Sequence, residues 1–443
     1  MERLVAALRL MDMGMTKLRI TAGVAAAVIA ATGCGSASAP RSSAPQPSAA
    51  GRGVTASDVA NARAYGASDT AFGLGVLGAW CRQDPAANIV LSPESLASGL
   101  GMAYLGARAS TARAMASVLH LPATGTALEA GLRARSAGLR GLDGPGVTVA
   151  GSDRVWASPS LMPLRSYLNE VAADYGASVG RAPLLTDPAR AVQEIDAAIA
   201  AATRGHIPQL LGPDSLNGIA WVLTDALYLH ADWASPFQAS ETRPGPFTTA
   251  NGRQVSAPFL HGGDFRFARL DGWTAVSLPY HGGKLTMTAL LPESGSGGCP
   301  ALSAAALGSI TSALSGRARH LPAAATSGLA PIALPKVSLH SSASLRSLLT
   351  SLGMGIAFTG AADFSGLSPS ACCIGLVVHA ATLAVAEKGT VASAATAVGV
   401  MPADAIAPPL GQIVFDRPYL LLVTATGTGE PLFLARVADP VVG

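Results

Sequence analysis

The spacing of apolar residues predicts helices in the first half of the chain and strands in the second. Ser92 and Pro93 suit an N-cap and a first helical position, so a helix is expected to follow the short apolar run at residues 89–91. Helical spacing also marks residues 55–80, 111–119 (with Ser110 as the cap), 167–175 and 189–203. Strand-like runs cover residues 221–230, 275–279, 285–291, 332–339, 376–385, 412–424 and 432–437. This order indicates the α+β fold class.

One segment near the carboxyl end has the composition of a loop but the pattern of a central strand. Residues 391–401 contain no charge and no proline, and Pro402 and Asp404 end the segment. In a strand, alternate residues from Thr390 to Val400 would form a row of small or apolar side chains suited to burial. The alternative is an alanine-rich surface loop, which a chain of this composition can produce by chance.

Two ionisable residues interrupt apolar strand patterns. Asp225 and His379 each lie inside a run of apolar residues. A buried ionisable group needs a partner, so the two are predicted to satisfy each other, together with Ser92 and Ser95, in a polar patch under a large sheet. Alternatively, backbone groups or water satisfy each of them separately.

The composition limits the class of protein. The chain has 443 residues, of which 49% are hydrophobic and 13% charged, and its net charge at pH 7 is +3. This length suffices for two or three hydrophobic cores, and the near-neutral balance does not favour nucleic-acid binding. After the leader, no apolar run reaches the ~18 residues that span a bilayer, which argues against a polytopic membrane protein.

The cysteines and histidines indicate neither a disulfide framework nor a metal centre. The sequence contains no C-x-x-C pair and no His/Cys cluster with the spacing of metal ligands. We therefore expect no metal and no cofactor. The neighbours Cys372 and Cys373 could join only through a strained ring, and the sequence leaves open whether Cys81 pairs with Cys299.

The first residues are typical of a bacterial lipoprotein leader. A basic region precedes a short apolar segment, and Ala31-Thr32-Gly33-Cys34 resembles a lipobox. Residues 1–33 are therefore a predicted signal peptide, and Met13 or Met15 is an alternative start. Cys34 would become the lipidated first residue of a secreted protein, anchored to the outer face of the cytoplasmic membrane through its lipid alone. An ordinary signal peptide cleaved nearby is the alternative.

The residues after the leader divide into a tether and a domain. Residues 34–54 are rich in serine, proline and alanine and hold almost no large apolar side chains, so they are expected to form a disordered tether. A single domain is expected over residues 55–443.

Several separate stretches resemble serpin motifs, in order and spacing, over nearly all of residues 58–440. The block Asn88–Ser95 is similar to N-I-x-x-S-P-x-S, and Asp225–Phe237 is similar to N-A-I-Y-F-K-G-x-W-x-x-P-F. Further matching stretches are Thr203–Ile207, Leu334–Lys336, His379–Ala381, the segment from Glu387, Phe415–Tyr419 and Pro431–Val437. The resemblance implies a serpin fold with three β-sheets, about nine helices and an exposed reactive loop at about residues 387–411.

The resemblance also implies a mechanism and a set of site residues. In an inhibitory serpin the target protease cuts the reactive loop and forms an acyl-enzyme, and the cut loop then inserts into the main sheet as a new strand and distorts the protease. The insertion-start region is assigned to Trp233, Lys336 and Glu387. The sheet-opening region is assigned to Ser92, Ser95, Asp225 and His379. The hinge is assigned to Glu387, Lys388, Gly389, Thr390, Ala392, Ala394 and Ala395.

Two positions depart from the family pattern. Asp225 stands where the family has asparagine, so its contact with His379 is predicted to be an ion pair that makes insertion more dependent on pH. Val391 replaces the usual glutamate and is expected to be tolerated, because it would face outward in the inserted strand.

The family spacing, counted from Glu387, places the scissile bond between Ala403 and Asp404. Met401 is the second choice, because the loop that follows is longer than in typical members. An alanine before the bond suits an elastase-like serine protease, and a cysteine protease is also a possible target.

Catalysis by this chain is not expected. Residues 176–180 match the G-x-S-x-G nucleophile elbow, but a predicted helix precedes the serine where the elbow needs a strand. The protein is therefore expected to be a monomeric protease inhibitor and not an enzyme. The rival hypothesis is a non-inhibitory serpin that serves as a surface binding or chaperone-like protein.

Overall fold

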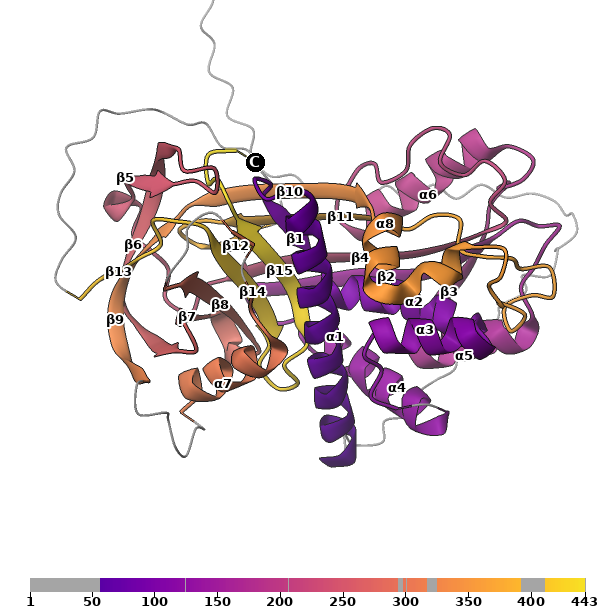
Figure 1. Ribbon diagram of the computed structural model, residues 1–443, viewed down its shortest axis with the longest axis horizontal. Coiled ribbons are helices and arrows are strands. Elements are labelled where there is room, and N and C mark those ends of the chain that lie inside the picture. Colours follow the sequence, from indigo (N-terminus) through magenta and orange to yellow (C-terminus); the bar gives the residue numbers. More distant parts are fainter. Residues whose placement is uncertain are drawn as a thin grey trace, which may run out of the picture. The chain divides into compact units, whose positions relative to one another are not determined.

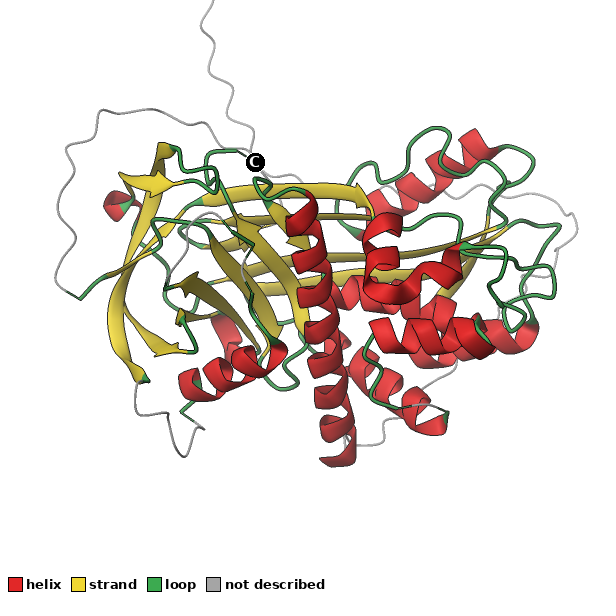
Figure 2. Ribbon diagram, in the orientation of Figure 1, coloured by secondary structure: helices red, strands yellow, loops and turns green. Residues whose placement is uncertain are grey.

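The computed structural model describes residues 56–123, 125–205, 207–293, 298–299, 301–316, 325–391 and 411–442. The long strands of one sheet run side by side, and the strands of the other sheets lie towards one end of them (Figure 1). The helices gather mainly around one end of the long strands (Figure 2). The mixture of helices and largely antiparallel sheets confirms the α+β class.

A six-stranded sheet contains the residues of interest. Its strand order is β10-β11-β12-β4-β2-β3. The strands are β2 (Val147–Ala157), β3 (Ser178–Arg181), β4 (Trp221–Asp232), β10 (Val337–Ser344), β11 (Val378–Val385) and β12 (Gly389–Val391). Every second residue of β11 is buried, starting with His379, as expected for a strand with one face on the core.

The other strands form two sheets that share the long strands β6 and β9. The order is β1-β15-β14-β8-β7-β6-β9-β13, and β5 pairs with β6. The first part of β6 pairs with β5 and its last part with β7, and its pairing with β9 changes register between Gly262 and Phe265. The three sheets implied by the resemblance are thus confirmed. These strands are β1 (Ile89–Leu91), β5 (Arg243–Thr248), β6 (Gln254–Leu270), β7 (Trp273–Pro279), β8 (Leu285–Pro292), β9 (Thr326–Pro335), β13 (Ile413–Val414), β14 (Tyr419–Ala425) and β15 (Pro431–Val437).

Within the described residues there are eight α-helices, compared with about nine predicted. They are α1 (Ala56–Gln83), α2 (Pro93–Gly106), α3 (Ala109–Val118), α4 (Thr126–Arg140), α5 (Arg165–Tyr175), α6 (Pro188–Ala202), α7 (Ala304–Leu314) and α8 (Arg346–Leu349). The start of α2 is as predicted, since the Ser92 side chain accepts a hydrogen bond from the Ser95 amide and Pro93 is the first helical residue. In the part of the chain that the structure describes, no helix is long and apolar enough to cross a membrane.

Three local predictions were wrong. Helix α3 begins at Ala109, so Ser110 lies inside the helix and is not its cap. The single strand predicted over residues 332–339 is two strands, because the chain passes from β9 to β10 at Lys336, directly after a proline that has no amide for the ladder. The strand predicted over residues 412–424 is likewise divided into β13 and β14, with Pro418 just before the second.

The alternation pattern also missed several elements. It gave no expectation for α4, β2, β5, β6 or α7. Around the G-x-S-x-G match, Ser178 begins β3 directly after α5, which is the reverse of the strand-to-helix order of a nucleophile elbow.

The structure settles the question of the cysteines that it describes. Cys81, near the end of α1, forms a disulfide with Cys299, which precedes α7, and the two Cα atoms are 5.6 Å apart. Cys372 and Cys373 are both free and exposed.

Candidate functional site

Within the described part of the predicted hinge, residues Gly389–Val391 form β12, which lies between β11 and β4 in the six-stranded sheet. In β12, Gly389 to Val391 pair with residues 230–232 of β4, and Thr390 and Val391 pair with Val385 and Ala384 of β11. Among the described residues, β4 and β11 share no pairing of their own, so β12 alone connects them. The sheet is therefore parted below β12.

Glu387 is held in place just before β12. Both of its carboxylate oxygens accept hydrogen bonds from the Lys336 ammonium group, at 3.0 and 3.2 Å, and the Thr242 hydroxyl donates to one of them at 3.0 Å. Partial burial opposes ionisation of Glu387, but hydrogen bonds from its own backbone amide, Lys336 and Thr242 outweigh it and lower its pKa. The structure thus brings Lys336 and Glu387 together as predicted.

Trp233, directly after β4, contacts the same turn from the other side. Its indole N–H donates to the Ala386 carbonyl at 2.9 Å, and its backbone amide donates to the Lys388 carbonyl at 2.9 Å. Its ring stacks on Tyr280, with centroids 4.5 Å apart and planes 11° apart. The backbone on both sides of Glu387 is therefore fixed by Trp233.

Thr390 is fully enclosed at the top of the opening. It is 1% exposed, and its hydroxyl lies 2.6 Å from the Tyr280 hydroxyl. Its neighbour Gly389 lies so close to the backbone of Ala231 and Asp232 that a Cβ atom there would clash with both. A small residue is required at the point where the hinge enters the sheet.

Below β12 a cavity of about 570 Å³ continues between β4, β11 and α2. Its walls include Ser95 and Leu100 from α2, Trp221 and Leu223 from β4, and His379 from β11. Most of the lining is apolar. The cavity has the position that an additional strand between β4 and β11 would occupy.

His379 and Ser92 meet beside this cavity. The backbone amide of Ser92 donates to Nε2 of His379 at 3.1 Å, and the Ser92 hydroxyl caps α2 through Ser95. Burial lowers the pKa of His379 to about 4, so the ring is neutral at pH 7. Three of the four predicted sheet-opening residues are therefore together. The side chain of Asp225 lies outside the described residues, and its ion pair with His379 stays a prediction.

A second buried polar group was not predicted. Arg135 of α4 lies 2.8 Å from Asp69 of α1, 3.3 Å from Glu94 of α2 and 3.1 Å from Glu430 in the β14–β15 turn, and all four side chains are 3–4% exposed. Burial raises the pKa of Asp69 well above its usual range, even though Arg135 opposes this, and raises the pKa of Glu94 to about 7. Four positions so far apart in the chain give no local signal.

Tyr280 and Thr242 were also missed as hinge partners. No local sequence pattern distinguishes either residue. Their hydroxyls become partners of Glu387 and Thr390 only because the chain brings these residues beside them.

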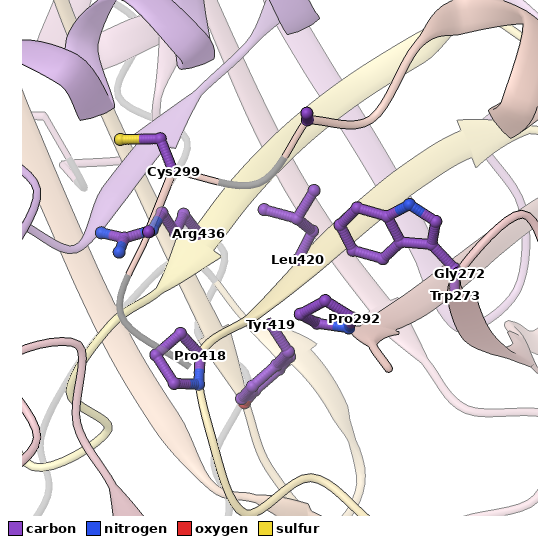
Figure 3. Close-up of a pocket in the computed structure, with 10 residues that line it drawn as sticks. Gly272, Trp273, Pro292, Cys299, Pro418, Tyr419, Leu420 and Arg436 are labelled. Carbon is purple, nitrogen blue, oxygen red and sulfur yellow. The ribbon is translucent and has the colours of Figure 1, made fainter. Parts of the chain in front are cut away.

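A separate pocket of about 270 Å³ lies where β14 and β15 meet the segment that holds Cys299. Figure 3 shows Trp273, Pro292 and Leu420 along one side of it and Arg436 beneath Cys299. Arg436 is fully buried and donates to the Ala87 carbonyl at 2.9 Å. This pocket shares no residue with the cavity in the six-stranded sheet.

The rest of the predicted site residues lie outside the described residues. They are Cys34, the hinge residues Ala392, Ala394 and Ala395, and the reactive-bond candidates Met401, Ala403 and Asp404.

Comparison with known proteins agrees with the fold. Residues 67–440 match the family model described as serpin (serine protease inhibitor). An uncharacterised serpin-like protein of Thermococcus kodakarensis is 33% identical over 367 residues, which cover 80% of this chain and 82% of that protein. The leukocyte elastase inhibitor of Bos taurus is 27% identical over 379 residues, covering 84% and 99%.

Among solved structures, human thyroxine-binding globulin in complex with its ligand superimposes with a TM-score of 0.69 at 23% identity, covering 86% of this chain and 99% of that one. The likeness to this structure concerns the fold. The family-model match, which spans most of the chain, shows that this protein belongs to the serpin family.

Proposed function

We propose that this protein is an inhibitory serpin, a suicide substrate that traps a serine endopeptidase by inserting its cleaved loop between β4 and β11. The observation that carries the proposal is the parted sheet. Thr390 and Val391 already pair with both β4 and β11, and a mostly apolar cavity lies further along the same opening, between residues 221–224 and residues 376–379.

The register of β12 supports insertion of the residues that follow it. Val391 pairs with His230 of β4 and Ala384 of β11. A strand that continued in this register would bring Thr396, in the middle of the small-residue row, opposite both residue 225 and residue 379. The pairing of a threonine with these two polar positions is what an inserted strand would require.

Insertion of the cleaved loop is expected to lower the free energy of the protein. Continuing the register from residue 392 to residue 400 reaches Trp221 at the start of β4. A central strand of this length makes on the order of ten backbone hydrogen bonds, each worth ~1 kcal/mol, and covers the apolar lining of the cavity. The fully inserted form is therefore expected to be more stable than the uncleaved one.

We propose an elastase-like target and the bond Ala403–Asp404, with Met401 as the second choice. The similarity to a leukocyte elastase inhibitor supports this target, and a cysteine protease is the alternative. The protein is proposed to act as a monomer without a cofactor, and not as an enzyme. Secretion, and anchoring through a lipid on Cys34, are proposed from the leader sequence.

The test is to mix the purified full chain with pancreatic elastase and to look for a complex that survives boiling in detergent. A covalent complex and a released fragment that starts at Asp404 are expected. Thr390→Arg should turn the inhibitor into a substrate, because it places a guanidinium at a fully buried position. Val391→Arg is the matched control, because adjacent strand residues face opposite sides.

Cleavage without a complex, and without a gain in thermal stability of the cut protein, would refute the inhibitory function and leave the rival role as a binding protein. A cut protein that gains stability but forms no complex would show that insertion works and that elastase is the wrong target.

A further inference from the structure

The adjacent cysteines Cys372 and Cys373 line the lower part of the cavity between β4 and β11. Both thiols are exposed, and the Cys372 thiol donates to the Cys373 sulfur at 2.7 Å. The two sulfur atoms therefore already face each other. The positive charge of Arg346, at the start of α8, favours the thiolate form of Cys373.

The position of this pair along the opening is specific. Val391 pairs with Ala384 in an antiparallel register. Each further loop residue in this register would face a residue one position earlier in the chain, first in β11 and then in the segment before it. Pro402 would then face Cys373, and Ala403 would face Cys372. The two thiols lie where the inserted strand is to end.

We propose that Cys372 and Cys373 form a redox site, a vicinal dithiol that closes reversibly to a disulfide and thereby limits insertion of the loop. The control of insertion rests on the proposed inhibitory function. The redox site itself does not.

The chemistry is thiol–disulfide exchange with a small disulfide such as oxidised glutathione. One thiolate attacks the external disulfide, which gives a mixed disulfide and releases one glutathione thiolate that takes up the proton. The neighbouring thiolate then attacks the protein sulfur of the mixed disulfide and releases the second glutathione. Two cysteines are oxidised and one external disulfide is reduced to two thiols.

Geometry makes the second step fast and the product reversible. The attacking sulfur is already in contact with its target, so closure is intramolecular. Adjacent Cα atoms are ~3.8 Å apart across a trans peptide, which is shorter than the ~4.4–6.8 Å of ordinary disulfides. A strained, exposed disulfide is readily reduced again. The hydrogen bond from Cys372, followed by burial, raises the pKa of Cys373, so exchange is faster above neutral pH.

The disulfide would change the edge that receives the loop. Successive side chains of a strand point to opposite faces, so two adjacent residues whose sulfurs are joined cannot both lie in an extended strand. In the structure, β11 begins only at Val378. The Ile374 amide donates to the Ala357 carbonyl at 2.9 Å. Reduced residues 372–377 can extend β11 once this one hydrogen bond opens, whereas the closed ring holds residues 372 and 373 out of the strand.

The experiment treats the full chain with oxidised glutathione at pH 8 and digests it with trypsin. The peptide Ser347–Lys388 contains both thiols and no other cysteine, so Cys34 and the Cys81–Cys299 disulfide do not interfere. The wild-type peptide is expected to lose two hydrogen atoms, to carry no glutathione, and to recover its mass after reduction. Cys372→Ser and Cys373→Ser should instead retain one glutathione. A wild-type peptide that carries glutathione, or that stays fully reduced, overturns the proposal.

The consequence for insertion is measured with the oxidised and the reduced protein side by side. With elastase, or another protease that forms the covalent complex, oxidation should lower the ratio of complex to cleaved protein roughly tenfold, which corresponds to one or two backbone hydrogen bonds. The double variant C372S/C373S should not respond.

An unchanged ratio in the oxidised wild type overturns the control of insertion. If the ring forms but the reduced protein traps no protease, the redox site stands and the inhibitory function fails, so the two proposals are tested separately.

Discussion

Acidification should destabilise the folded protein through His379. The ring is buried, and its Nε2 accepts the Ser92 amide, so a proton on Nε2 would set two donors against each other. Burial lowers the pKa in the folded state to about 4, compared with 6.5 for a free histidine. The unfolded chain therefore binds the proton first, and stability is present above pH 6.5 and lost as the pH falls towards 4.

The size of this effect follows from the two pKa values. The full difference corresponds to ~3 kcal/mol, of which ~2 kcal/mol is lost between pH 7.5 and pH 5. Glu94 acts in the opposite direction, since burial raises its pKa to about 7 and its contribution is lost as the pH rises through that value. A comparison of two proteins that both contain Glu94 removes this second effect.

The assay is urea unfolding of wild type and His379→Gln at several pH values from 7.5 to 5. Glutamine can still accept the Ser92 amide and cannot be protonated in this range. The stability advantage of the wild type over the variant should shrink by ~2 kcal/mol towards pH 5. His340→Gln, at an exposed position of β10, is the control and should leave the pH profile of the wild type unaltered.

A constant difference between wild type and His379→Gln would refute the buried neutral ring. A difference that grows as the pH falls would have another meaning. It would indicate that His379 is protonated and paired with Asp225, as the substitution of aspartate for the family asparagine predicts.

Two further changes test the buried arginine and the hinge. Arg135→Met should cost ~3–5 kcal/mol in urea unfolding, because it leaves three buried carboxyl groups without their counter-ion. Arg190→Met is the control. Its side chain is 69% exposed and pairs with Glu194 at the surface, so its loss should cost under ~1 kcal/mol, and equal costs would contradict a buried counter-ion role for Arg135. Gly389→Ala should weaken the pairing of β12 by ~1–3 kcal/mol, because its Cβ meets the backbone of Ala231. The fraction of protein that elastase cleaves without forming a complex should therefore increase. Gly138→Ala is the control and should not change this fraction, because nothing lies within 4 Å of its added Cβ.

The sequence alone determined the features that depend on neighbouring residues. The cap at Ser92 and the proline after it set the start of α2, and both can be recognised because a helix start is satisfied by groups within one turn. The succession of serpin motifs likewise identified the three sheets and brought Lys336 and Glu387 together, as the structure has them. The small residues after Glu387 predicted a hinge, and the first two of them, Gly389 and Thr390, lie in the strand β12.

Only the tertiary structure decided the features that depend on distant groups. The pairing of Cys81 with Cys299 spans 218 positions, and the buried Arg135 gathers carboxylates from three separate elements. Residues 332–339 read as one strand because apolar alternation does not record which sheet a residue joins, and the chain changes sheets at Lys336. The parted sheet is of the same kind, since no local pattern in β4 or β11 specifies whether the two strands pair with each other or with a third.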